Sequence, residues 1–112
     1  MSAYKNILIA KKAETCHISL NNPKKINALS STALKEISNA CDEIALNKKI
    51  KIVVISSTSE NFSAGADLRE ISKNKTIEDY WHENAGRNCI NSILNLPQIS
   101  ICLIEGYCLG GG

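Results

Sequence analysis

The 112-residue chain lacks the features that mark several large classes of protein. No apolar run approaches the roughly 20 residues of a membrane-spanning helix. The N-terminal stretch MSAYKNILIAKK has neither the apolar core of a signal peptide nor the arginines of a transit peptide. The net charge of +2 is too small to indicate a nucleic acid or a membrane surface as partner. We therefore expect a cytoplasmic protein with no nucleic-acid or membrane partner.

The common motifs for nucleotide binding and nucleophilic catalysis are also missing. The sequence contains no GxxxxGK[ST], no GxGxxG and no GxSxG, which excludes a P-loop, a dinucleotide fingerprint and a nucleophile elbow. Ser63 precedes Ala-Gly, but neither His17, in an expected strand, nor His82, in an expected helix, is placed by the sequence as its base. We interpret both histidines as ordinary surface or packed residues.

The five cysteines show no CxxC or CxxH spacing, and their number is odd. Most of them stand among apolar residues. This pattern favours small buried hydrophobic side chains in a reducing compartment over a disulfide framework or a zinc site. We expect no metal site.

What the sequence does contain is typical of a globular domain, with 44% hydrophobic and 21% charged residues. Ile7–Ala10 and Cys16–Leu20 favour strands, and the Lys-Lys-Ala-Glu between them favours a hairpin turn. Ser30 or Ser31 can cap a helix that ends near Asn47. Its apolar stripe is predicted to comprise Leu34, Ile37, Cys41, Ile44 and Ala45.

The second half of the chain alternates strands and helices. The β-branched run Ile50–Ile55 predicts a strand covered on both faces. A helix is expected over much of Ile77–Leu96, ended by Pro97, and ISICLIEGYCLGGG is predicted to be another buried strand that runs into glycines. The order hairpin, helix, strand, helix, strand predicts an α/β fold with a mainly parallel sheet flanked by helices.

Two glycine-containing loops follow the expected parallel strands. They are NFSAGADLRE and GYCLGGG, and both leave the carboxyl ends of strands, where α/β proteins bind ligands. Two backbone N–H groups converging there on one oxygen can stabilise an oxyanion. Such loops are common, so the signal is weak when taken alone. Asp67 and Glu70 begin an expected helix after the first loop. A role for them in a site is no better supported than simple stabilisation of the helix N-terminus by their negative charge.

Three segments together resemble the crotonase family, the enoyl-CoA hydratase/isomerase superfamily. LNNPKKINALS resembles the family's L-N-x-P-x-x-x-N-A-L segment, NFSAGADLREI its F-x-A-G-A-D-[IL]-x-E loop, and GYCLGGG its G-x-x-x-G-G-G stretch. The resemblance covers nearly all 112 residues in order. It implies the N-terminal half of a crotonase-like (ClpP/crotonase) spiral of ββα units.

The resemblance also implies roles for residues. A coenzyme A thioester would lie across the loops, with its carbonyl oxygen bound by the N–H groups of Ala66 and Gly111. Lys24, Lys25 and Ile26 would lie by the adenine end, although the two lysines are equally well explained as solvated. The remaining residues expected to flank the ligand are Ala64, Asp67, Leu68 and Arg69. Coenzyme A enters as part of the substrate, and no covalently bound cofactor is expected.

The chain also departs from the family pattern. Members run to roughly twice this length or more. The two glutamates that act as acid and base in hydratases would lie beyond Gly112, as would the trimer-forming helices. We therefore expect residues 1–112 to be a truncated N-terminal portion of a single crotonase-like domain, inactive alone, whose intact form hydrates 2-enoyl-CoA.

Three alternatives stay open. They are another family reaction (isomerisation, decarboxylation or thioester hydrolysis), a non-catalytic remnant, and a module completed by a separate chain. A homo-oligomer, the family's trimer or hexamer, is expected of the intact form more than of the fragment.

Overall fold

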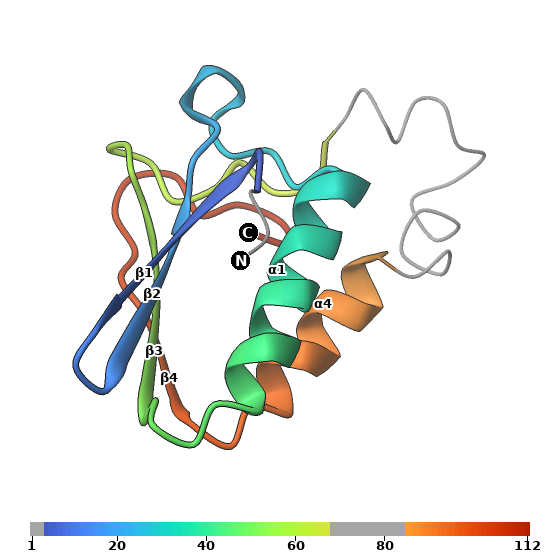
Figure 1. The fold of residues 1–112 in the computed structure, drawn as a ribbon. Coiled ribbons are helices and arrows are strands. Elements are labelled where there is room, and N and C mark those ends of the chain that lie inside the picture. Colours follow the sequence, from blue (N-terminus) through green and yellow to red (C-terminus); the bar gives the residue numbers. More distant parts are fainter. Residues whose placement is uncertain (1–3, 68–84) are drawn as a thin grey trace.

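A computed structural model describes residues 4–67 and 85–112. Within them, a four-stranded sheet has the order β1-β2-β3-β4, and two helices, α1 and α4, lie side by side on one of its faces (Figure 1). β1 (Ile7–Lys12) pairs antiparallel with β2 (Thr15–Leu20). β3 (Ile52–Ser57) is parallel to β2, and β4 (Ile99–Cys102) is parallel to β3. The predicted α/β class and mainly parallel sheet are confirmed.

The N-terminal hairpin is tighter than its sequence predicts. Lys12 pairs with Thr15, so the two strands extend into the segment that was expected to turn. Only Ala13 and Glu14 remain for the turn, and Ala13 has a left-handed φ of 53°. Compact two-residue turns with positive φ match the right-handed twist of the strands they join. His17 lies in β2, as expected.

Helix α1 (Ser31–Ala45) agrees closely with the prediction. The side chain of Ser30 accepts the N–H of Ala33, which satisfies one of the free donors at the helix start. The predicted stripe faces the sheet: Leu34, Ile37, Cys41 and Ile44 are buried. The amphipathic spacing therefore fixes which side of the helix enters the core.

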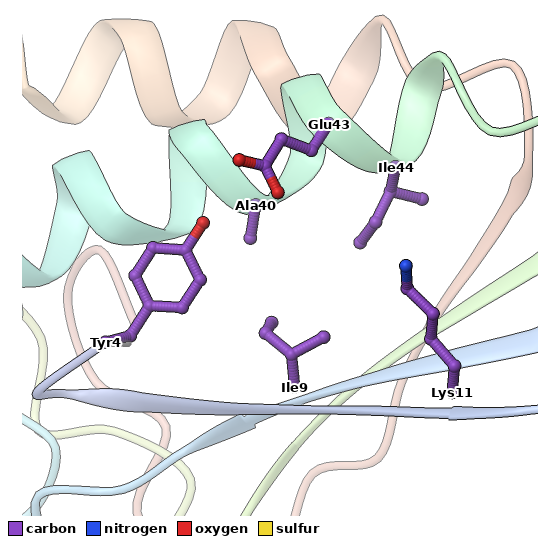
Figure 2. A pocket seen from close by; sticks show the side chains of 6 residues that line it. All are labelled: Tyr4, Ile9, Lys11, Ala40, Glu43 and Ile44. Carbon is purple, nitrogen blue, oxygen red and sulfur yellow. The ribbon is translucent and has the colours of Figure 1, made fainter. Parts of the chain in front are cut away.

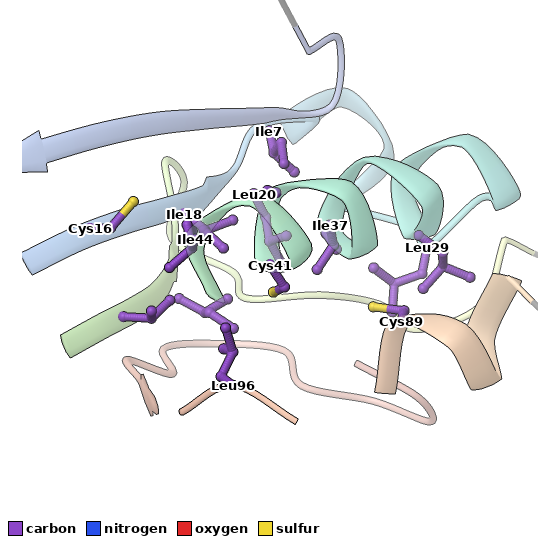
Figure 3. Close-up of a cluster of buried hydrophobic side chains, with 14 of the residues drawn as sticks. Ile7, Cys16, Ile18, Leu20, Leu29, Ile37, Cys41, Ile44, Cys89 and Leu96 are labelled. Carbon is purple, nitrogen blue, oxygen red and sulfur yellow. The ribbon is translucent and has the colours of Figure 1, made fainter. Parts of the chain in front are cut away.

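The core lies between the sheet and the two helices (Figure 3). α4 (Ala85–Leu94) contributes Cys89 and packs against α1. Cys16, Cys41 and Cys89 are buried, as expected, whereas Cys102 and Cys108 are exposed. Residues 77–84 of the helix expected over Ile77–Leu96 lie outside the described residues. His82 is one of them. No helix in the described part of the chain is long and apolar enough to cross a membrane.

β4 is not the buried strand that its apolar sequence predicts. All four of its residues are exposed, with Ile99 at 65% and Ile101 at 41% of full exposure. The physical reason is its place at the sheet edge, where β3 is its only described strand neighbour. A continuous apolar run indicates a strand that can be covered on both faces, but it does not supply the cover. Leu103 and Ile104, just beyond β4, are exposed in the same way.

Candidate active site

Three loops meet beyond the carboxyl ends of the parallel strands. We call them the Asn loop (residues 22–29), the AGA loop (residues 63–67) and the Gly loop (residues 107–112). Isolated parallel bridges join Leu29 to Ala66 and Ser63 to Cys108, so the AGA loop lies between the other two. The sequence expectation that the two glycine loops point the same way from parallel strands is thus confirmed.

Backbone hydrogen bonds attach the AGA loop to the Asn loop. The N–H of Ala64 donates to the carbonyl oxygen of Ile26 at 2.9 Å, and the N–H of Leu29 donates to the carbonyl oxygen of Gly65 at 2.8 Å. Two of the segments expected to flank one ligand are therefore in direct contact, although about forty residues of chain separate them.

The AGA loop and the Gly loop are equally close. The N–H of Ser63 donates to Tyr107 at 2.9 Å, and the N–H of Leu109 donates to the Ser63 carbonyl at 3.1 Å. Gly65 has a φ of 90°, and a Cβ there would collide with the carbonyl oxygen of Leu109 and lie 3.4 Å from the nitrogen of Gly111. Only glycine fits both the backbone conformation and the close approach.

Two backbone N–H groups at this junction have no partner among the described residues. They belong to Ala66, which is half-buried, and to Gly111, which is exposed. Gly110 takes a left-handed φ of 53°, and the N–H of Gly112 closes a turn on the carbonyl oxygen of Leu109 at 2.8 Å. Because Ala66 is only half-buried and Gly111 is exposed, each loop presents one N–H that can bond to water or to a ligand.

The buried side chain of Asn27 was not singled out by sequence reasoning. Asn27 is 3% exposed and has a left-handed φ of 51°. Its Oδ1 accepts the N–H of Asn22 at 2.7 Å, and its Nδ2 donates to Ser57 Oγ at 2.8 Å and to the Phe62 carbonyl at 2.9 Å. Two signals were available in the sequence. Asparagine tolerates the left-handed region, and Asn27 is the asparagine of N-A-L in the family segment that LNNPKKINALS resembles.

The other residues expected at the site are distributed around these loops. Lys24 and Lys25 are exposed on the short 3-10 helix η1 (Pro23–Lys25), which ends at Ile26 with a left-handed φ of 52°. Asp67 is buried, at 9% exposure, at the end of the AGA loop. Leu68 and Arg69, like Glu70, lie outside the described residues.

An apolar cavity of about 190 Å³ opens beside the Gly loop. Gly111 and Gly112 line one side of it, and Leu29, Phe62 and Cys89 are among its other lining residues. The cavity lies between the sheet and the helices. Because Gly111 lines it, an apolar group in the cavity would lie next to the N–H of Gly111.

A second, smaller cavity of about 40 Å³ lies between β1 and α1 (Figure 2). The Tyr4 hydroxyl is buried on its wall without a partner in the described structure, and Lys11 and Glu43 also line it. Burial raises the pKa of Tyr4, and the nearby Glu43 and Glu36 raise it further. This volume suits a bound water better than a substrate. No cluster of His, Cys, Asp or Glu in the described part of the chain could hold a metal ion.

Comparisons with known proteins agree with this architecture. A family model for enoyl-CoA hydratase/isomerase matches residues 10–112. The chain is 31% identical over 108 residues to the short-chain-enoyl-CoA hydratase of Clostridium acetobutylicum, covering 96% of this chain and 41% of the relative. It is 38% identical over 96 residues to the mitochondrial methylglutaconyl-CoA hydratase of Mus musculus, covering 85% of this chain and 31% of that one.

A solved structure gives the same result in three dimensions. The enoyl-CoA hydratase from Bacillus anthracis superposes with a TM-score of 0.88 at 30% identity, covering 96% of this chain and 43% of that one. The chain belongs to the enoyl-CoA hydratase/isomerase family and has the crotonase fold. It spans less than half the length of the relatives that it matches.

Proposed function

We propose that residues 1–112 are the N-terminal portion of a single crotonase-like domain and that they supply the oxyanion-binding backbone of a site for acyl-CoA thioesters. The shares of 41% and 43% of the matched relatives support the first part of the proposal. The observation that carries the second part is the pair of unpaired N–H groups, on Ala66 and Gly111, at the junction of two loops that contact each other.

The chemistry of a thioester makes such a pair useful. When a proton leaves or a nucleophile adds near the carbonyl, negative charge builds on the carbonyl oxygen. Two fixed N–H donors stabilise that charge more than they stabilise the neutral ground state, so they lower the barrier. Loss of one oxyanion donor in enzymes costs about 2.7–4 kcal/mol, or roughly 10²–10³ in rate.

Hydration of a 2-enoyl-CoA is the reaction we favour for the intact protein. The two curated relatives described above are named as hydratases of CoA thioesters, one of them for short chains. The proton transfers would fall to the glutamates that the resemblance assigns to positions after Gly112. Isomerisation, decarboxylation and thioester hydrolysis would use the same two donors.

The other contacts of the ligand follow from the same arrangement. The acyl group would enter the apolar cavity beside Gly111. The coenzyme A portion would run along residues 64–69 towards Ile26, with Lys24 and Lys25 near its phosphates. Coenzyme A would be the only cofactor, as part of the substrate. We propose a cytoplasmic homo-oligomer for the intact protein.

The proposal can be tested on the 112-residue chain by chemical ligation. Cys108 allows residues 1–107, as a thioester, to be joined to a synthetic peptide of residues 108–112. An ester in place of the Gly110–Gly111 amide removes the Gly111 N–H without adding a ring or a side chain. The matched control places the ester at Gly112, whose N–H instead bonds to Leu109 within the loop.

The readout is the infrared carbonyl band of crotonyl-CoA labelled with ¹³C at the thioester carbon. The ligand is added at several times its expected dissociation constant, roughly millimolar or about −4 kcal/mol. In the all-amide chain and in the Gly112 ester we expect the bound carbonyl band at lower frequency than in water. In the Gly111 ester most of that shift should disappear. Equal shifts in all three chains would exclude Gly111 as a donor.

A further inference from the structure

Ser63 is the residue at which all three loops of the site are tied together. Its side chain is completely buried, at 0% exposure. Its Oγ donates to the carbonyl oxygen of Asn27 at 2.8 Å and accepts the N–H of Gly65 at 3.0 Å. A single hydroxyl therefore links the Asn loop to the Ala64–Gly65 peptide, one peptide before the one that carries the Ala66 N–H.

The backbone of Ser63 makes the third connection. Its N–H and its carbonyl oxygen bond to Tyr107 and Leu109 in the Gly loop. Its Cβ is also close to Gly112, since a Cβ added at Gly112 would lie 2.9 Å from it. Every polar atom of Ser63 is thus engaged. Three of its four partners, Gly65, Tyr107 and Leu109, belong to the loops that carry the N–H groups of Ala66 and Gly111.

We propose that Ser63 is a positioning residue, and that its hydroxyl sets the orientation of the AGA loop from which the Ala66 N–H meets the substrate carbonyl. The inference rests on the proposed function of Ala66. The hydroxyl fixes the Gly65 N–H, and Gly65 has the left-handed φ of 90° that turns the chain between Ser63 and Ala66. Without that bond the Ala64–Gly65 peptide loses its hydrogen bond to Ser63. The next peptide, which carries the Ala66 N–H, is then held only by the bond from the Leu29 N–H to the Gly65 carbonyl oxygen.

A role as a nucleophile is excluded by the same contacts. The hydroxyl hydrogen is directed at a carbonyl oxygen, which is not a base strong enough to remove it. The oxygen is buried and already accepts the Gly65 N–H, so no substrate atom can approach it. The AGA loop therefore uses its serine to hold backbone in place.

The test compares Ser63→Ala with Ser38→Ala in the 112-residue chain. Ser38 is a matched control because it is also a buried serine, at 8% exposure, but its hydroxyl has no partner in the described structure. Ser63→Cys, which keeps the side-chain shape and a weaker donor, is the second variant in case Ser63→Ala does not fold. All chains are studied at one protein concentration.

Two readouts separate positioning from mere support of the fold. The first is hydrogen exchange of the Gly65 amide, which we expect to be about five- to tenfold faster in Ser63→Ala and unchanged in Ser38→Ala. The second is the infrared shift of the bound ¹³C-crotonyl-CoA carbonyl. We expect Ser63→Ala to lose most of that shift and Ser63→Cys part of it, with ligand affinity reduced less than about fivefold.

The outcomes distinguish this inference from the function on which it rests. A full carbonyl shift in Ser63→Ala overturns the positioning role, even if the Gly65 amide exchanges faster, because the hydroxyl would then support only the fold. Exchange and carbonyl shift that match those of Ser38→Ala also overturn it. If the unmodified chain shows no carbonyl shift, the proposed function of the N–H pair fails first, and the inference about Ser63 falls with it.

Discussion

Glu36 on α1 holds Asn6 at the start of β1 by two hydrogen bonds. The backbone N–H of Asn6 donates to Oε1 at 2.8 Å, and its Nδ2 donates to Oε2 at 3.3 Å. The N–H of Lys5 donates to the same carboxylate at 3.0 Å. Glu36 is 9% exposed, so this buried carboxylate is satisfied by the chain that enters the first strand.

We predict that Glu36→Gln lowers the free energy of unfolding by about 1–3 kcal/mol. The amide keeps one acceptor, turns a donor towards two N–H groups and removes the charge that strengthens these bonds. Urea unfolding measures the change. Glu43→Gln, an exposed change on the same helix, is the control and should stay within about 0.5 kcal/mol. Equal stabilities for the two variants would show that the carboxylate contributes nothing to docking β1.

Ile26 offers a test of strain at the proposed coenzyme A loop. A β-branched residue with a φ of 52° is unfavourable by roughly 1–2 kcal/mol. Ile26→Gly relieves this strain and loses the half-buried side chain, worth roughly 1 kcal/mol. We therefore expect a change in unfolding free energy within about 1 kcal/mol, together with weaker binding of crotonyl-CoA.

The control for that prediction is Ile26→Val, which keeps both the β-branch and the strain. It should bind the thioester like the parent chain. Thermal unfolding and titration calorimetry supply the two numbers. If Ile26→Gly binds as tightly as Ile26→Val, the Ile26 side chain has no part in ligand binding, and its conformation needs another explanation.

Local patterns in the sequence predicted the elements that depend on local physics. The spacing of Leu34, Ile37 and Cys41 gave the buried face of α1, and a serine before the stripe gave its cap. The β-favouring run Cys16–Leu20 gave the strand β2, and the structure buries Cys16 and Ile18 on one of its faces. Such elements can be read from single segments because neighbouring residues determine them.

Contacts between distant segments could not be read in this way. Ser63 bonds to Asn27 across 36 residues, so its role depends on where two loops are brought by the sheet. Sequence reasoning considered Ser63 only as a nucleophile and gave Asn27 no role of its own. The exposure of Ile101 was missed for a related reason, since burial depends on which element covers a strand. The donors Ala66 and Gly111 were inferred through the family resemblance, and their role stays a prediction.

The buried thiols make stability depend on pH in the alkaline range. Burial raises the pKa of Cys41 from 9.0 to about 12, and that of Cys89 from 9.0 to about 11. The folded state thus holds these protons more tightly than the unfolded state. Their contribution to stability is complete below about pH 9 and is lost as the pH rises through the folded values.

We predict that the unfolding free energy falls between about pH 9 and pH 12, and that the fall is shallower in Cys41→Ala. Cys108→Ala is the control for removing a thiol, because Cys108 is exposed and lies outside the buried core. Urea unfolding at a series of pH values gives the slopes. A Cys41→Ala chain with the parent slope would contradict a shifted Cys41 thiol.

The exposed apolar surface of β4 and the residues after it predicts self-association of the 112-residue chain. Ile99, Ile101, Leu103 and Ile104 are each between 41% and 65% exposed, and among the described residues no strand lies on the outer side of β4. Large apolar patches and bare edges both promote association.

Ile101→Lys places a charge in the middle of this surface, which should raise the concentration needed for association by about tenfold or more, equivalent to about 1.4 kcal/mol. Leu8→Lys is the matched control, because Leu8 is 50% exposed and lies on β1, at the opposite end of the strand order from β4. Sedimentation velocity over a range of concentrations separates the three chains. A parent chain that stays monomeric throughout, or a Leu8→Lys chain that dissociates as readily as Ile101→Lys, would show that the β4 surface does not drive association.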